Sequence, residues 1–168
     1  MTDPGLREAI RRAYKFACGY CGVREEDAGS QLELDHFKPR SAGGNHEFEN
    51  LVYCCPTCNR LKGDFWSNDV LSEKRLLHPK HDDLTKHLLL EQNGLFTALT
   101  KIGEFHLMRL RLNRPPLVAL RRARAENAKL REELARARTA QRLLYERLVA
   151  LDEEIERLLK EIARFSDG

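Results

Sequence analysis

The sequence predicts an α+β protein: a small zinc-bound domain built from two strands and a short helix, followed by a long C-terminal α-helix that forms a coiled coil. Three observations lead to this prediction: two Cys-x-x-Cys pairs, alternating polar and apolar residues between them, and a C-terminal stretch with neither glycine nor proline. We divide the 168 residues into a zinc-stapled core at 1–78, an accessory hairpin and helix at 79–116, and a coiled-coil helix at 117–168.

The composition is that of a folded chain that does not cross a membrane. Charged residues make up 33% and hydrophobic residues 42% of the sequence, with a formal net charge of +3, which argues against a wholly disordered chain. No apolar run approaches the roughly 18 residues that a membrane-spanning helix needs. The charged N-terminus lacks the apolar region of a secretory signal. We therefore expect a cytoplasmic protein with no membrane partner.

Local signals place the elements of the first part of the chain. A helix begins at Asp3-Pro4, because aspartate caps helices and proline favours their first position. We expect this helix to run until Gly19 and Gly22 turn the chain. Further elements are expected in the order strand 31–37, loop 41–45, strand 51–54 and helix 56–62, the last closed by Gly63.

The accessory part, residues 79–116, is predicted to hold a hairpin and a helix. A two-residue Asn-Gly turn joins apolar segments at 88–90 and 95–99, which is a strong hairpin signal. A helix is then expected from Thr100 to about Asn113, because two prolines follow it.

Residues 117–165 carry a heptad repeat without a helix breaker. Position a is taken by Leu120, Asn127, Leu134, Gln141, Leu148, Ile155 and Ile162, and position d by Ala123, Leu130, Ala137, Leu144, Leu151, Leu158 and Phe165. Such a pattern predicts a coiled coil. In a parallel pair of helices, opposite charges would face each other at Glu126 and Arg131, Glu133 and Arg138, and Arg147 and Asp152. We prefer a homodimer through this helix; the alternatives are packing on its own globular part or docking onto a larger partner.

Four of the five cysteines have the spacing of zinc ligands. Cys18 and Cys21 form one pair, and Cys55 and Cys58 form the other. In the cytosol such pairs bind metal rather than form disulfides, and four thiolates complete a closed tetrahedral zinc site with a structural role. Cys54 is left over and is expected to be a small buried apolar residue, although spacing alone also allows it to replace Cys55.

An acid, a histidine and an asparagine lie close to these cysteines. Asp35 and His36 come late in the first strand, and Asn59 directly follows Cys58. A histidine can take a proton from water, and a hard divalent cation held by oxygen ligands can stabilise the charge that develops in phosphodiester hydrolysis. Adjacent residues of an ideal strand point to opposite faces. A bend near residues 37–39 would therefore be needed for Asp35 and His36 to act on one phosphate.

The segment from Cys18 to Gly63 resembles the HNH endonuclease family, in the form whose ββα-metal core is held by a four-cysteine zinc site. The resemblance rests on the Asp-His pair, the downstream proline, the Gly-Gly loop and Asn50-Leu51. It also includes Cys-x-x-Cys-Asn with a lysine three residues further on. The third motif position is asparagine where some members have histidine, so the chain resembles an HNN variant.

The resemblance implies specific roles for four residues. His36 corresponds to the general base, and Asp35 and Asn59 to the residues that hold the catalytic Mg²⁺ or Mn²⁺. Asn50 corresponds to the middle asparagine, which organises the loop that carries the histidine. The implied activity is hydrolysis of DNA to 5′-phosphate and 3′-hydroxyl ends.

The function that we expect is therefore that of a metal-dependent DNA endonuclease, serving as the nuclease subunit of a restriction or phage-defence system. The alternative is a non-catalytic zinc module that binds DNA and dimerises through its coiled coil. Basic residues near the site could contact phosphates; they are Lys38, Arg40, Arg60 and Lys62.

Overall fold

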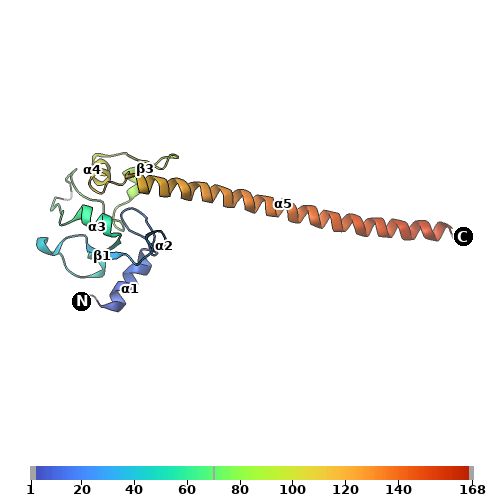
Figure 1. Ribbon diagram of the computed structural model, residues 1–168, viewed down its shortest axis with the longest axis horizontal. Helices are drawn as coiled ribbons and strands as arrows, with labels where there is room; N and C mark the ends of the chain where they lie inside the picture. Colours follow the sequence, from blue (N-terminus) through green and yellow to red (C-terminus); the bar gives the residue numbers. More distant parts are fainter. Residues whose placement is uncertain (1–2, 70, 167–168) are drawn as a thin grey trace. The chain divides into compact units, whose positions relative to one another are not determined.

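The computed structural model describes residues 3–69 and 71–166, and contacts divide the chain into two compact units at 1–122 and 123–168. The first unit mixes helices with two small antiparallel sheets, and the second is the C-terminal part of one long helix (Figure 1). The predicted α+β class is confirmed. Among the described residues, no helix is both long and apolar enough to cross a membrane.

The sheet that carries the site joins strands β1 (Glu33–His36) and β2 (Leu51–Cys54) in antiparallel register, with His36 opposite Leu51. Short 3₁₀ helices at Arg40–Ala42 and Phe48–Asn50 lie between the two strands. Helix α3 (Pro56–Lys62) follows directly and contacts β1. The second strand and this helix have the predicted bounds, because Pro56 and Gly63 mark the helix ends locally.

Two helices end earlier than predicted, and for the same reason. Helix α1 (Pro4–Ala13) stops where Lys15 adopts a φ of 52°, and α4 (Lys101–Arg109) stops where Arg111 adopts a φ of 45°. At each end, one amide bonds five residues back and the preceding amide bonds three residues back, which is the pattern of a Schellman cap. Glycine usually takes the left-handed position of this cap. A long basic residue there gives no sequence signal.

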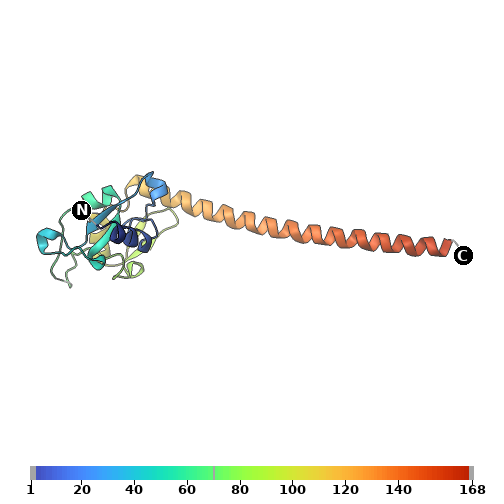
Figure 2. The ribbon, with the colours of Figure 1, turned by 90° about the horizontal axis from the view of Figure 1, so that it is seen from below.

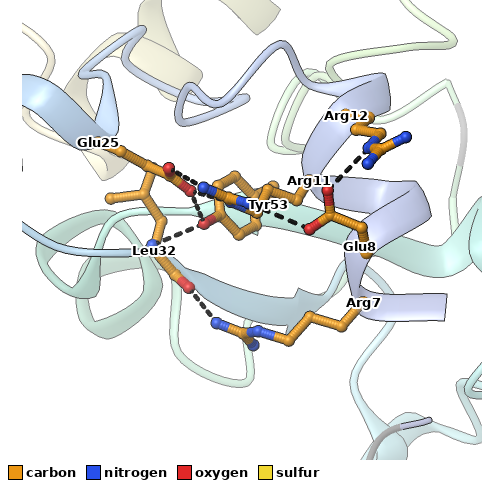
Figure 3. Close-up of polar contacts among 7 residues, drawn as sticks. All are labelled: Arg7, Glu8, Arg11, Arg12, Glu25, Leu32 and Tyr53. Atoms are coloured by element: carbon orange, nitrogen blue, oxygen red, sulfur yellow. Dashed lines mark hydrogen bonds and ion pairs between the residues drawn. The ribbon is translucent and has the colours of Figure 1, made fainter. Parts of the chain in front are cut away.

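A polar network fastens α1 to the sheet through helix α2 (Glu25–Ala28) (Figure 3). Arg11 donates from Nε and Nη2 to the two carboxylate oxygens of Glu25, at 2.5 and 2.6 Å. Tyr53 of β2 donates its hydroxyl proton to the same carboxylate and accepts from the Leu32 amide at 2.8 Å. The charge of Arg11 and the Tyr53 hydroxyl together hold the pKa of Glu25 below its usual value.

The accessory segment contains a 3₁₀ helix at Leu84–Lys86, the strands β3 (Leu88–Leu90) and β4 (Phe96–Ala98), and α4. The hairpin is present, but its loop has three residues rather than two. The Glu91 amide bonds the Leu95 carbonyl at 2.8 Å, and the Gly94 amide bonds back to the Glu91 carbonyl at 2.9 Å. Gly94 has a φ of 81°, which suits the left-handed residue of a three-residue hairpin loop.

One hydrophobic core joins the accessory segment to the sheet. It takes buried side chains from α1, both sheets and the segment after α4, including Ile10, Leu32, Leu51, Val52, Tyr53, Leu76, Leu88, Leu110 and Leu112. The accessory hairpin and helix therefore complete the same folded body as the cysteine-bearing part.

Helix α5 (Pro115–Ser166) begins at the two prolines that were predicted to end the preceding helix. Proline favours the first turn of a helix, where its missing N–H would have no partner. Figures 1 and 2 both show α5 as one uninterrupted helix. Its first residues belong to the first unit, because Leu117 is buried and Arg121 donates to the Leu112 carbonyl at 2.5 Å.

His106 gives the first unit a sensitivity to acid. It is fully buried in α4, where its Nδ1 accepts from the Leu77 amide at 3.1 Å, and burial lowers its pKa from 6.5 to about 4. Above pH 6.5 both the folded and unfolded states hold the neutral ring. Below pH 6.5 the His106 ring becomes protonated in the unfolded state but stays neutral in the folded state. The free energy of unfolding therefore falls as the pH drops towards 4.

We therefore expect His106→Asn, which keeps an acceptor near the Leu77 amide, to flatten this dependence. Urea unfolding between pH 7 and pH 5 should lose less stability in the variant than in the wild type, by about 1–2 kcal/mol at the acid end. His81→Asn, at an exposed position, is the control. Equal slopes in all three proteins would contradict the assignment.

Candidate metal centre and nuclease site

The four predicted zinc ligands come together. The Sγ atoms of Cys18, Cys21, Cys55 and Cys58 all lie within 4.8 Å of one another, and those of Cys21 and Cys55 are 3.7 Å apart. Four sulfurs arranged tetrahedrally around zinc, each at about 2.3 Å, lie about 3.8 Å from each other. The cluster therefore has the donor set and the size of a structural zinc site.

Local backbone geometry prepares both cysteine pairs. At the first pair, the Gly22 amide bonds back to the Cys18 carbonyl at 2.8 Å, and Gly22 has a φ of 73° that glycine adopts without strain. At the second pair, Cys55 is the N-cap of α3 and its sulfur accepts from the Cys58 amide at 3.4 Å. The local backbone conformation alone therefore brings the two sulfur atoms of each pair close together.

Arg114 also contacts the cysteine cluster, and the sequence did not reveal this. Its Nη2 lies 3.6 Å from the sulfur of Cys58 and 3.9 Å from those of Cys21 and Cys55. If zinc is bound, a guanidinium at this position would offset part of the negative charge of the four thiolates that hold it. Cys54 is fully buried outside the cluster, and burial raises the pKa of its thiol, so it is the small apolar residue that was expected.

A cavity of about 280 Å³ opens beside β1 and α3. It is lined by Leu34, Asp35, His36, Pro39, Arg40, Ser41, Asn59, Gly63 and Asp64. The acid, the histidine and the asparagine singled out in the sequence thus share one cavity. Asp64, which was not among the predicted residues, adds a second carboxylate.

Asp35 is held between a tyrosine and a lysine. Its Oδ2 accepts from the Tyr20 hydroxyl at 2.7 Å, and its Oδ1 accepts from Lys62 Nζ at 3.0 Å. Burial raises the pKa of the Asp35 carboxyl, while the Lys62 charge opposes that rise. Lys62 also donates to the carbonyls of His36 and Gly63 at 2.8 and 3.2 Å. The lysine therefore ties the end of β1 to the end of α3.

Asn59 is oriented by the strand beside it. Its Nδ2 donates to Glu33 Oε2 at 2.7 Å. This bond assigns the amide nitrogen to Glu33 and leaves Oδ1 as the atom that can serve a cation. Glu33 and Asp35 are two apart on β1, so the period of the strand places both on the face that α3 covers.

His36 turns the other way, towards the loop that precedes β2. Its Nε2 lies 2.9 Å from the Nδ1 of His46. Burial is the main reason that the pKa of His36 is lowered, and His46, Arg40 and Lys62 lower it further. The alternation expected of a strand is thus kept, and Asp35 and His36 still line one cavity because β1 ends at His36.

Asn50 ties together the loop that leaves His36. Its Oδ1 accepts from the Lys38 amide at 2.8 Å, and its Nδ2 donates to the carbonyls of Lys38 and Asn45 at 3.0 and 2.8 Å. Gly44 makes this close approach feasible. A Cβ at Gly44 would lie 1.8 Å from the Lys38 carbonyl oxygen, so a larger residue there would force the loop apart.

The four basic residues suggested for phosphate contact lie in different settings. Arg40 lines the cavity and Arg60 is exposed on α3. Lys38 is half-buried, with its Nζ 5.7 Å from the centre of the Trp66 ring. Lys62 is only 1% exposed and is committed to Asp35. We therefore retain Arg40, Arg60 and Lys38 as candidate phosphate contacts. Lys62 belongs to the interior of the site.

The donor atoms at the two sites suit different metals. Four clustered thiols fit zinc, which favours sulfur. The carboxylates of Asp35 and Asp64 and the amide oxygen of Asn59 fit a hard cation such as Mg²⁺ or Mn²⁺.

Together, the antiparallel strands, the helix after them and the four cysteines form a ββα arrangement with a clustered set of thiols. Residues 18–65 match the model of the HNH endonuclease family. The chain is also 27% identical over 144 aligned residues to the Septu protein PtuA of Bacillus mycoides (strain KBAB4). That match covers 69% of this chain and 20% of the relative, so the chain spans about a fifth of the relative's length.

Proposed function

We propose that this protein is a divalent-cation-dependent endonuclease that hydrolyses phosphodiester bonds in DNA. The observation that carries the proposal is the shared cavity of His36, Asp35 and Asn59 within an HNH domain. A divalent cation bound there would supply charge stabilisation at the phosphate and the leaving oxygen. Zinc at the four cysteines has a structural role in this proposal.

The side chains of the cavity have separate tasks. His36 takes the proton of the attacking water, and its lowered pKa keeps the ring neutral and basic near pH 7. Asp35 and Asn59 would hold the cation, with Glu33 keeping the amide oxygen of Asn59 free for it. Arg40 at the cavity rim and exposed Arg60 fix the phosphate backbone by charge.

Cleavage of supercoiled plasmid DNA with Mg²⁺ or Mn²⁺ tests this function. His36→Ala should lower the cleavage rate by about 10²- to 10⁴-fold, which is the usual contribution of a general base. His81→Ala is the matched control, because His81 is exposed and pairs with Glu49 away from the cavity. If the wild-type protein cleaves neither DNA nor RNA with any divalent ion but still binds DNA, the non-catalytic zinc module is the better description.

We further propose that the C-terminal helix pairs with a second copy of the chain. The heptad residues of α5 in the second unit are exposed over several turns, for example Leu134 at 51%, Leu144 at 69% and Leu151 at 48%. Burial of such a stripe against an identical parallel helix would also bring the opposite charges at positions g and e together. Docking onto a larger partner is the alternative use of the same stripe.

The pairing can be tested in the full chain by equilibrium sedimentation. Changing both Leu144 and Leu151 to lysine places charge in the seam and should convert a dimer to a monomer. Changing Ala150 to lysine adds a charge outside the seam and should leave the dimer intact. A wild-type chain that sediments as a monomer at tens of micromolar would refute homodimerisation and favour a partner of another kind.

The biological setting that we propose is a restriction or phage-defence system, with this chain as the nuclease subunit. The similarity to a Septu protein supports this role. A strain that carries the complete locus should lose protection against phage when His36→Ala replaces the wild-type chain. Unchanged protection would show that defence does not require His36 and would contradict this role.

A further inference from the structure

We infer that His46 is a positioning residue that selects the tautomer in which His36 can act as a base. The inference deepens the proposed nuclease function and rests on it. It stands on the hydrogen bond between His36 Nε2 and His46 Nδ1, 2.9 Å long, with the ring centroids 5.0 Å apart and the ring planes inclined by 41°. The rings thus meet through their nitrogens and are not stacked face to face.

The loop that carries His46 is fixed on the side nearest His36. Asn50 bonds the carbonyl of Asn45 at 2.8 Å, and the Asn45 side chain donates to Glu47 at 2.8 Å. The same Asn50 amide holds both backbone groups of Lys38, two residues after His36. One side chain therefore sets the relative position of the two segments that carry the histidines. The hydrogen bonds of Asn50 thus hold the backbone on both sides of the contact between His36 and His46.

The bond imposes a choice on two neutral imidazoles, because one ring must donate and the other must accept. If His36 donates from Nε2, its Nδ1 carries a lone pair that can take a proton from water. If His46 donates instead, His36 accepts through Nε2, carries its own proton on Nδ1 and has no free lone pair left for water. The productive arrangement therefore has His46 accepting through Nδ1 and carrying its own proton on Nε2.

This arrangement follows a general rule for histidines in active sites. The partner of one ring nitrogen decides what the other nitrogen can do, and loss of such a partner commonly costs about 10- to 100-fold in activity. His46 does not need to touch DNA or water for this effect. It acts through His36.

Three variants separate positioning from packing. His46→Leu fills the space but offers no acceptor, and we expect the single-turnover cleavage rate to fall about 10- to 100-fold. His46→Asn offers Oδ1 near the position of the lost Nδ1, and we expect it to recover most of that rate. His81→Leu removes an exposed histidine elsewhere and should leave the rate unchanged. Zinc content and melting temperature, measured for each protein, show that the fold is kept.

The second measurement does not depend on activity. Nitrogen NMR of ¹⁵N-histidine-labelled protein, at a pH above 7 where His36 is neutral, reports which ring nitrogen carries the proton. We expect His36 to be protonated at Nε2 in the wild type and in His46→Asn, and to become a mixture of tautomers in His46→Leu.

The two readouts keep this inference separate from the proposed nuclease function. A His46→Leu protein with the wild-type rate and the wild-type His36 tautomer would overturn it. So would a wild-type His36 that carries its proton on Nδ1. A wild-type protein that cleaves nothing would refute the nuclease function alone, and the tautomer of His36 would still decide the role of His46.

Discussion

Chelation of zinc is expected to unfold the first unit of the chain. The four cysteines join the turn after α1 to the start of α3. Both strands of the β1–β2 sheet lie between the two cysteine pairs in the sequence, so a bound zinc would cross-link the two ends of this segment. Structural zinc sites contribute about 10–16 kcal/mol of apparent binding free energy near neutral pH. That exceeds the net stability of most small domains, which is about 5–15 kcal/mol. Cooperative thermal unfolding, followed by the fluorescence of Trp66, should disappear when a strong chelator is added.

Single cysteine variants provide a matched comparison for this expectation. Cys58→Ala removes a ligand and should abolish both zinc binding and the cooperative transition. Cys54→Ala removes a thiol that is equally buried but lies outside the cluster. It should keep one zinc per chain and lose only about 1 kcal/mol, the usual cost of a small cavity. If Cys58→Ala and Cys54→Ala behaved alike, the assignment of the zinc site would fail.

The elements that the sequence located best are those with a local signal at both ends. Helix α3 lies between Pro56 and Gly63, and β2 lies between Asn50 and the N-cap Cys55, so short-range stereochemistry defines them. The ends of α1 and α4 were misplaced because Lys15 and Arg111 take left-handed conformations that glycine normally signals. Here the hydrogen bonds of the cap outweigh the intrinsic preference of the residue.

In the candidate site, too, some residues could be found from the sequence and others could not. Spacing and residue type were enough to single out the cysteines, Asp35, His36 and Asn59. The side chains that orient them come from elsewhere in the fold. Tyr20 lies in the cysteine turn and donates its hydroxyl hydrogen bond to Asp35, while Arg114 reaches the sulfurs from just before α5. No periodicity in the sequence connects such pairs. For Glu33 a signal did exist, because it lies two residues before Asp35 on the same strand.

Lys62 lies in a different environment from the one that the sequence suggested. Its position three residues after Asn59 suggested a phosphate contact, whereas the fold buries it against Asp35. A buried ammonium next to this carboxylate favours its ionised form and opposes the rise in pKa that burial causes. In this structure Lys62 therefore belongs to the interior of the cavity wall and is paired with Asp35.

Replacement of Lys62 by methionine should accordingly cost more stability than any surface substitution. It leaves the Asp35 carboxylate buried without its partner, a change that typically costs about 3–5 kcal/mol. The carbonyls of His36 and Gly63 lose their donor as well. Urea unfolding of the zinc-loaded protein at pH 7 measures the loss. Lys101→Met is the matched control, since Lys101 is exposed on α4 and should change stability by less than about 0.5 kcal/mol.

The pH dependence and a second substitution identify Asp35 as the cause. Burial already raises the pKa of Asp35, and loss of the lysine charge should raise it further. A carboxyl whose pKa is higher in the folded state favours folding at low pH and loses that contribution as the pH rises through the folded-state value. The deficit of Lys62→Met should therefore shrink between pH 7 and pH 5. Adding Asp35→Asn to Lys62→Met removes the unpaired charge and should restore part of the lost stability at pH 7. If the double variant were as unstable as the sum of the two single variants, the lysine would contribute through packing and not through the charge of Asp35.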